Sequence, residues 1–180
     1  MAALTVLATR DPRYSYRRLL VDMSRILMSS GYTQTPMLGS SGPIDLDMPV
    51  VVKPDAAART KALLIGINYT GQGAGELLGS HNDVDNVKKL ITGLGFDTSR
   101  ERMHILKDDG VCTNPTKQNI WEGLRWLIKD AKPNDCLFLH FSGHGGQVTS
   151  RPCTKISDSV SKILVWHCSS DCCQPLSLRF

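Results

Sequence analysis

The sequence predicts an α/β fold with a mainly parallel sheet flanked by helices. Short apolar runs at 61–69, 103–106 and 136–141 are typical of buried strands. Two stretches in which apolar residues recur at helical spacing, 80–94 and 116–130, alternate with these runs. The order strand, helix, strand, helix, strand favours right-handed parallel connections, and functional residues usually lie at the carboxyl ends of such strands.

The N-terminal part predicts one further helix. Residues 14–30 place apolar side chains at helical spacing, and Gly31 stands where a C-terminal cap is expected. These apolar residues are Tyr16, Leu19, Leu20, Met23, Ile26 and Leu27. The polar stretch 33–49 has room for one short extended piece at 35–38, and residues 52–60 have the composition of a linker.

The two helices between the predicted strands each have a start signal and an apolar face. Ser80 is the candidate N-cap of the first, after the glycine-rich loop 70–79, and Asp83 follows three residues later. Pro115 marks the start of the second. The faces that we expect to be buried comprise Val84, Val87, Ile91 and Leu94 in the first helix and Ile120, Leu124, Leu127 and Ile128 in the second.

The last part of the chain differs in character. From Val148 onward there is one apolar run, at 163–166, and no clear period. We expect 149–180 to be a disordered tail with no place in the sheet.

Composition excludes several classes of partner. The chain has 180 residues, enough for one domain with a core, and a net charge of +4 without any long basic run. No apolar stretch approaches the roughly 18 residues of a membrane span. We therefore expect neither a nucleic acid nor a membrane as partner.

The N-terminal residues predict neither a secretory signal peptide nor an organelle transit peptide. Residues 1–8 are apolar but short and no basic residue precedes them, while Asp11 and Asp22 argue against a transit peptide. We expect a cytoplasmic protein whose six cysteines are reduced thiols.

The motif Ser142-Gly-His-Gly-Gly146 ends the third predicted strand. A histidine flanked by glycines at a strand end suits a general acid or base, because the glycines let a substrate backbone approach and leave amide N–H groups free for an oxyanion. On its own, the motif is more often a structural turn.

Several segments in a fixed order carry more information than this motif alone. They are KALLIGINY at 61–69 with the short loop after it, HNDVDNVKKLI at 81–91, PTKQNIWEGLRWLIKDAKPND at 115–135 and LFLHFSGHGGQ at 137–147. Together, from about residue 61 to 148, they resemble the front half of a metacaspase domain. The resemblance implies a partial caspase-like (caspase/haemoglobinase) fold and the function of a cysteine endopeptidase.

The resemblance also implies roles for four residues. His144 would be the catalytic histidine, acting as general acid to the leaving amine, and the Gly145 amide would be an oxyanion donor. Ser142 and Asp83 would line the pocket for the substrate side chain, which the family prefers to be Arg or Lys. Capping of a helix N-terminus is the alternative reading of Asp83. His81 receives no role.

The chain departs from the family after His144. Metacaspases continue into an acidic Ca²⁺-binding loop and a strand that leads to the nucleophilic cysteine and His-Ser-Gly, whereas here Asp158 and Asp171 are the only later carboxylates. The segment most similar to the family's nucleophile motif is Asp171-Cys172-Cys173, but Gln-Pro follows it instead of His-Ser-Gly. We expect Cys173 to be a poor nucleophile, the chain to be catalytically impaired or inactive, and no cofactor to be bound.

The remaining thiols suggest no metal site. Cys153, His167, Cys168, Cys172 and Cys173 can be read as a cluster, but the spacing is not a recurring zinc pattern. We predict no metal and interpret these residues as unorganised tail cysteines. Cys112 and Cys136 are interpreted as a loop and a core residue.

The N-terminal segment resembles the closing helix and last strand of metacaspase domains, which in intact relatives follow the nucleophile. The predicted division is therefore 1–51 for this segment, 52–60 for the linker, 61–148 for the front half of the catalytic domain and 149–180 for the tail. Circular permutation, a recombined tandem gene or a frameshift would produce this order, and we favour a rearranged or frameshifted product.

Three functions remain open. The first is an endopeptidase that cuts peptide or protein substrates after Arg or Lys, with Cys173 or another chain's cysteine as nucleophile. The second is a non-catalytic relative that binds substrates or an intact metacaspase. The third is a product without function, whose missing strands leave sheet edges unpaired.

Overall fold

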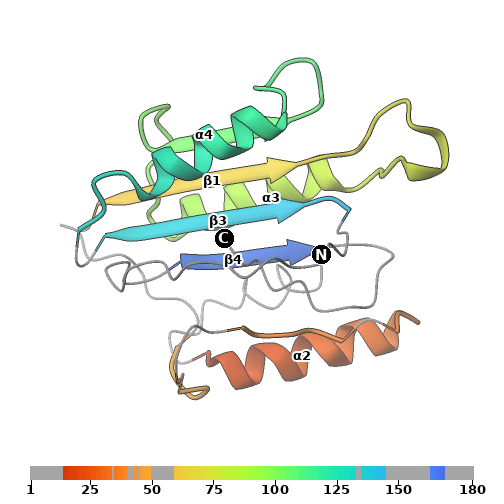
Figure 1. Cartoon of the computed structure of the whole chain (residues 1–180). Helices are drawn as coiled ribbons and strands as arrows, with labels where there is room; N and C mark the ends of the chain where they lie inside the picture. Colours follow the sequence, from red (N-terminus) through yellow and green to blue (C-terminus); the bar gives the residue numbers. More distant parts are fainter. Residues whose placement is uncertain are drawn as a thin grey trace, which may run out of the picture. The chain divides into compact units, whose positions relative to one another are not determined.

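The fold comes from a computed structural model, which describes residues 14–33, 35–39, 43, 45–49, 59–132, 135–144 and, for the backbone alone, 163–168. The described residues up to Pro49 belong to one compact unit and those from Arg59 onward to another (Figure 1).

The N-terminal unit is built on helix α2, Tyr16–Ser29, which confirms the predicted amphipathic helix. The hydroxyl of Ser15 caps its start by accepting the N–H of Arg18, and Gly31 follows its end with a positive φ of 77°, as a C-terminal glycine does. The N–H groups of Tyr16 and Arg17 donate to the carbonyls of Met48 and Leu46, so residues 46–48 satisfy donors that a helix start leaves free.

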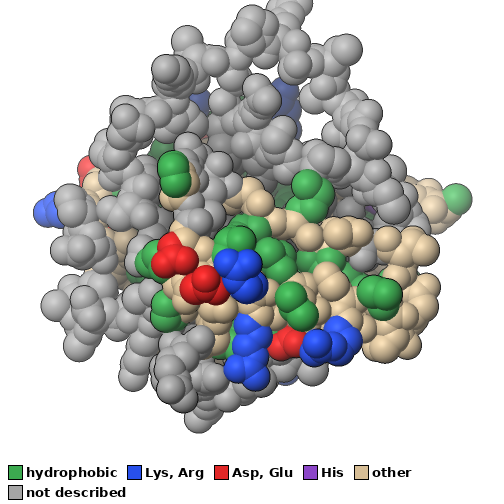
Figure 2. All heavy atoms as spheres, turned by 90° about the horizontal axis from the view of Figure 1, so that it is seen from below, with side chains coloured by type: hydrophobic (Ala, Val, Ile, Leu, Met, Phe, Trp, Pro, Cys, Tyr) green, Lys and Arg blue, Asp and Glu red, His purple; other side chains and the backbone are tan. Residues whose placement is uncertain are grey.

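Residues 35–39 form no strand that pairs with a neighbour. On the face shown in Figure 2, the coloured side chains include apolar ones that lie among basic and acidic ones.

The second unit contains a four-stranded sheet. Its strands are β1 (Thr60–Gly66), β2 (Met103–Lys107), β3 (Cys136–Ser142) and β4 (Ile163–Cys168), in the order β2-β1-β3-β4. All neighbouring pairs are parallel, which confirms the predicted α/β class. β1 is buried along its whole length, as its continuous apolar run predicts.

Strand β4 corrects the expectation that nothing after Val148 belongs to the sheet. The backbone of Ile163–Cys168 pairs in parallel with β3, from Leu137↔Ile163 to Ser142↔Cys168. Strands of parallel sheets carry continuous apolar runs, and the apolar run at 163–166 is of this kind. The other residues of the expected tail, 149–162 and 169–180, lie outside the described residues.

Helices α3 (Ser80–Gly93) and α4 (Lys117–Ile128) cover opposite faces of the sheet (Figure 1). The chain passes from β1 to β2 in one direction and from β2 to β3 in the other, so right-handed connections require opposite faces. Alternate residues of β1 face the two helices. Leu63 and Ile65 join the core cluster with Leu127 of α4, whereas Gly66 lies against Ser80 and Val84 of α3.

Three details differ from the sequence-based expectation. β1 begins at Thr60, which was assigned to the linker. Gly79 rather than Ser80 is the N-cap of α3, and it has no side chain to cap the helix. Ile128 is 47% exposed, because the buried face of α4 is centred on Gly123 and Leu127 and Ile128 lies beyond its edge.

The helix interiors otherwise follow the predicted faces. Val84, Val87 and Ile91 are buried, and Ile120 and Leu124 pack against the core cluster. Among the described residues, no helix has the length and apolar character needed to cross a membrane.

Candidate active site

The carboxyl ends of β1 and β3 meet at one edge of the sheet. Gly66 and Ser142 are register partners, and beyond them the N–H of Ile67 donates to the carbonyl of Ser142 at 2.9 Å. From β1 the chain turns toward β2, whereas β3 leads toward β4 on the other side. This makes the β1/β3 edge the topological switch point, where open α/β sheets usually bind ligands.

His144 follows β3 at this edge and is held on two sides. Its backbone N–H donates to the hydroxyl of Tyr69 at 3.2 Å, and its imidazole Nε2 lies 2.8 Å from the carbonyl oxygen of Gly75. The Tyr69 and His144 rings are 4.9 Å apart and inclined by 37°. The side chain predicted from the glycine-rich motif is thus fixed by residues that follow β1.

The Gly75 contact determines the tautomer of a neutral His144. A carbonyl oxygen only accepts hydrogen bonds, so Nε2 carries the proton and donates it. Nδ1 is then the basic nitrogen, able to accept a proton from a reacting group. This is the protonation pattern that a general base requires before the reaction begins.

Ser142 and Asp83, which the resemblance assigns to the substrate pocket, are in direct contact. The Ser142 hydroxyl, 2% exposed, donates to Oδ2 of Asp83 at 2.9 Å. Asp83 lies in the first turn of α3, so it is close to the helix N-terminus as well. Both readings of Asp83, a pocket carboxylate and a charge at the helix N-terminus, fit this geometry.

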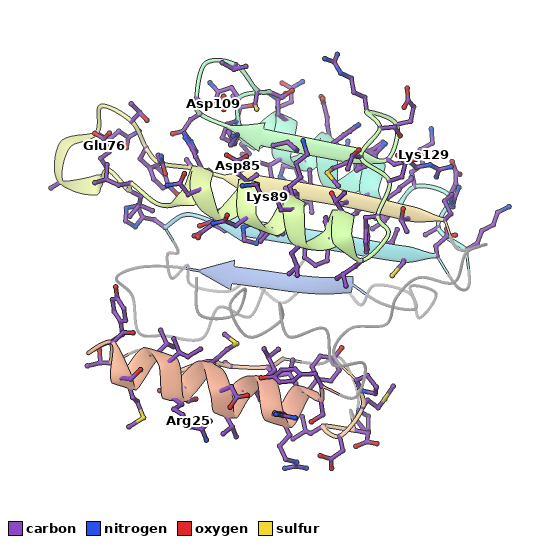
Figure 3. The ribbon with its side chains drawn as sticks, turned by 180° about the vertical axis from the view of Figure 1, so that it is seen from behind. Arg25, Glu76, Asp85, Lys89, Asp109 and Lys129 are labelled. Atoms are coloured by element: carbon purple, nitrogen blue, oxygen red, sulfur yellow. The ribbon has the colours of Figure 1, made fainter. Side chains whose placement is uncertain are left out.

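Asn68, at the start of the loop that carries Gly75, anchors the end of this loop by two hydrogen bonds. Its side-chain oxygen accepts the N–H of Ser80 at 3.0 Å, and its carbonyl accepts the N–H of Leu77 at 2.7 Å. Between these anchors lies the 3₁₀ turn η1 (Gly73–Gly75). Glu76, labelled in Figure 3, directly follows this turn.

The sequence-based interpretation missed a hydrogen-bonded His–Asp pair beside this loop. Nε2 of His81 lies 2.6 Å from Oδ1 of Asp108, and both side chains are 19% exposed. Burial works against ionisation of Asp108, but hydrogen bonds from the N–H of Asn68 and from His81 lower its pKa below the ordinary value. No local sequence motif indicates this pair. Asp108 follows β2 and His81 belongs to α3, so only the fold brings them together.

The cysteines in the described part of the chain lie at both ends of the sheet. Cys136 begins β3, at the end away from His144, and Cys112 lies in the loop after β2. Burial and the neighbouring Asp109 raise the pKa of the Cys112 thiol, which disfavours the reactive thiolate. The backbone of Cys168 pairs with Ser142, which brings it to the same edge as His144. The sequence pattern suggested Cys168 only as part of a thiol cluster.

The other predicted site residues lie outside the described part of the chain. These are Gly145, Cys172 and Cys173, together with Cys153 of the conceivable thiol cluster and the carboxylates Asp158 and Asp171. Within the described part, no three His, Cys, Asp or Glu side chains gather as metal ligands would.

Comparison with known proteins places this arrangement in a family. The sequence profile of the metacaspase, peptidase C14 domain matches residues 60–170, more than half of the chain and beyond the 61–148 of the sequence-based resemblance. The sheet and its flanking helices are consistent with a partial caspase-like fold, as expected.

Three curated relatives illustrate the similarity. Metacaspase III c of Phaeodactylum tricornutum is 38% identical over 159 residues, 87% of this chain and 47% of that protein. Metacaspase-1 of Sclerotinia sclerotiorum is 52% identical over 95 residues and Metacaspase-1B of Neurospora crassa 55% over 91. These two alignments cover 52% and 49% of this chain. The chain spans about half the length of the first relative and about a fifth of the other two.

The alignment with the Phaeodactylum protein also bears on the order of segments. The alignment covers 87% of the 180 residues, so about 23 residues of this chain lie outside it. Wherever these lie at the two ends of the chain, residues 24–157 fall within the alignment. The aligned part therefore runs from the second half of α2 through β1 to His144. From its domain match and these relatives, the chain belongs to the metacaspase family of peptidases.

Proposed function

We propose that this chain is a metacaspase-type cysteine endopeptidase that cleaves after Arg or Lys, with strongly reduced activity. The single observation that carries the proposal is His144, held at the carboxyl end of β3 by Gly75 and Tyr69. Its position at the switch point of a parallel sheet supports a role in chemistry rather than in a turn alone.

His144 would act first as a general base and then as a general acid. Its Nδ1 accepts the proton of a cysteine thiol, and the thiolate attacks the peptide carbonyl carbon. When the C–N bond breaks, the imidazolium returns the proton to the leaving amine, and water then hydrolyses the thioester. The Gly75 carbonyl stabilises the imidazolium by accepting its Nε2–H.

The preference for basic residues rests on Asp83. Its carboxylate lies beside the buried end of β3, where Ser142 donates to one of its oxygens. A carboxylate held in this way pairs well with a guanidinium or ammonium group. We infer that Asp83 binds the Arg or Lys side chain that precedes the cleaved bond, and that protein substrates with such residues are the partners.

Reduced activity follows from the nucleophile region. The sequence after β4 reads Ser169-Ser170-Asp171-Cys172-Cys173-Gln174-Pro175, without the His-Ser-Gly of the family. A reactive cysteine needs an electropositive, well-placed surrounding, which this sequence does not provide. The register of Cys168 beside Ser142 makes it a second candidate nucleophile next to Cys173.

Peptide hydrolysis tests this function. Fluorogenic peptides ending in Arg or Lys are compared with peptides ending in Asp or Leu, with and without Ca²⁺, for the wild type, His144→Ala, Cys168→Ala and Cys173→Ala. We expect slow hydrolysis of the basic peptides alone, abolished by H144A and by one of the cysteine variants. Hydrolysis that survives H144A, or none at all, would contradict the proposal.

A non-catalytic binder is the second candidate, favoured because the Asp83–Ser142 contact is present while the His-Ser-Gly sequence is not. Such a protein would bind substrates, or an intact metacaspase, through the same pocket. Fluorescence anisotropy of a labelled Arg-ended peptide measures this: a binder without catalysis retains affinity in H144A and loses it in Asp83→Asn. Equal affinity of the wild type and D83N would exclude it.

A further inference from the structure

Tyr69 stands in an unusual backbone conformation next to His144. Its φ is 54°, in the left-handed region that residues with a side chain rarely occupy. In this conformation its hydroxyl accepts the N–H of His144 and its ring lies against the imidazole. A side chain that depends on an unfavourable backbone angle needs neighbouring groups that hold the angle.

Asp108 supplies those groups. Its Oδ1 accepts the N–H of Asn68 at 2.8 Å, and its Oδ2 accepts the N–H of Thr70 at 3.4 Å. The carboxylate thus binds the backbone on both sides of Tyr69. It also fixes the first residues of the loop that carries Gly75, the acceptor of the His144 imidazole proton.

His81 holds the carboxylate in turn. A carboxylate is an acceptor only, so the 2.6 Å contact requires His81 to donate from Nε2 to Oδ1 of Asp108. The three hydrogen bonds to Asp108 come from α3 and from the segment after β1, whereas Asp108 itself follows β2. One side chain therefore joins three parts of the fold beside the site.

We propose that Asp108 is a positioning residue for His144, acting through the backbone around Tyr69, and that His81 supports it. The inference rests on the proposed function in one respect: positioning His144 matters for catalysis only if His144 is the catalytic histidine. Its structural content is independent: the carboxylate fixes the loop conformation that holds the imidazole as the Nε2–H tautomer.

The neighbouring residue provides a matched control. Asp109 also accepts two backbone N–H groups, from Val111 at 3.0 Å and Cys112 at 2.8 Å, but these belong to its own loop. Both residues follow β2, and Asp109 is labelled in Figure 3. Replacing it with Asn removes a comparable carboxylate without touching the backbone around Tyr69.

The experiment is NMR of the full chain with ¹⁵N-labelled histidine imidazoles. Of the five histidines, the signals that His144→Gln removes identify His144. We expect well-separated Nδ1 and Nε2 shifts in the wild type and in Asp109→Asn, as one fixed tautomer gives. In Asp108→Asn, we expect the separation to shrink by at least about half, because both tautomers become populated.

A second pair of variants keeps the test decisive if D108N does not fold. His81→Gln retains a donor at the position of Nε2, whereas His81→Leu removes it. We expect wild-type His144 shifts in H81Q and a reduced separation in H81L. His144 shifts that stay at wild-type values in folded D108N, or in H81L where D108N is unfolded, would overturn the inference. The readout needs no substrate, so a failed peptidase assay contradicts only the proposed function.

Discussion

Gly66, the last residue of β1, lets α3 cross the end of the strand at close range. A Cβ atom built on it would lie 2.7 Å from the carbonyl oxygen of Ser80 and 2.7 Å from Cγ2 of Val84. Such distances are too short for real side chains, and the Ser80 oxygen belongs to the helix backbone. Gly66 is therefore what allows the start of α3, which carries Asp83, to approach Ser142.

Replacing this glycine tests that close approach. We expect Gly66→Ala to lower the free energy of unfolding by about 1–3 kcal/mol, because overpacking forces the helix away from the strand. Gly93→Ala is the control: it lies in α3 with nothing near its Cβ position, and we expect a gain of roughly 0.5–1 kcal/mol. Denaturant unfolding measures both, and equal effects would contradict the packing argument.

Single residues at the site were predictable from the sequence only where a motif contains them. The glycine-rich motif indicated His144 and Ser142, and the structure gives both of them partners at the end of β3. Tyr69 ends the segment KALLIGINY, but that segment indicated a strand and gave Tyr69 no role, and Gly75 and Asp108 belong to no motif. Their contacts depend on a left-handed backbone angle and a 3₁₀ turn, which no local pattern of residue types specifies.

Among the elements, α4 is joined to the sheet by a polar contact as well as by apolar packing. The rings of His104 in β2 and Trp126 in α4 are stacked, with centroids 3.6 Å apart. Nζ of Lys61 in β1 donates to the carbonyls of Trp126 and Lys129, both at 2.9 Å, and so satisfies groups at the helix end. Burial, followed by the charge of Lys61, lowers the pKa of His104, although a hydrogen bond with the Arg100 backbone opposes this.

This contact predicts a stability that falls in acid. The unfolded state binds a proton near pH 6.5, whereas folded His104 binds it only at lower pH, so lowering the pH from 6.5 favours unfolding. His104→Phe keeps a stacked ring without a titrating group. We expect the free energy of unfolding to fall more in the wild type than in H104F between pH 7.5 and pH 5, as followed by denaturant unfolding. A difference that is constant with pH would contradict this.

The elements themselves were largely predictable, since β1, β3, α3 and α4 have strong apolar periodicity. Errors occurred where the three-dimensional context decides. Ser80 is inside α3 because Asn68 takes its N–H, and the short run at Ile163–Cys168 becomes a strand through pairing with β3. Local composition contains neither piece of information.

At the scale of the whole molecule, the described residues form two units with unequal cores. Among the described residues of the N-terminal unit, the buried apolar side chains are those of Tyr14 and Leu19, whereas the described part of the second unit buries fourteen, from Ala62 to Leu139. Free energy from apolar burial grows with the area removed from water. The two units are therefore expected to differ in local stability.

Amide hydrogen exchange followed by mass spectrometry measures this difference. We expect peptides from 16–29 to exchange faster than peptides from 60–66 and 136–142, because fewer buried contacts protect them. Equal protection of the two sets would show that the units open together and would contradict the expectation.

The central claim is that this chain has the histidine part of a metacaspase site without an efficient thiolate partner. Alkylation of its six cysteines by iodoacetamide at pH 6, mapped by mass spectrometry in the wild type and in His144→Ala, tests it most directly. We predict rates that differ by less than about twofold at every cysteine, since without an efficient His144–thiolate pair the loss of the imidazole leaves thiol reactivity unchanged. A cysteine, Cys168 or Cys173 above all, that reacts at least about tenfold faster in the wild type would contradict the account.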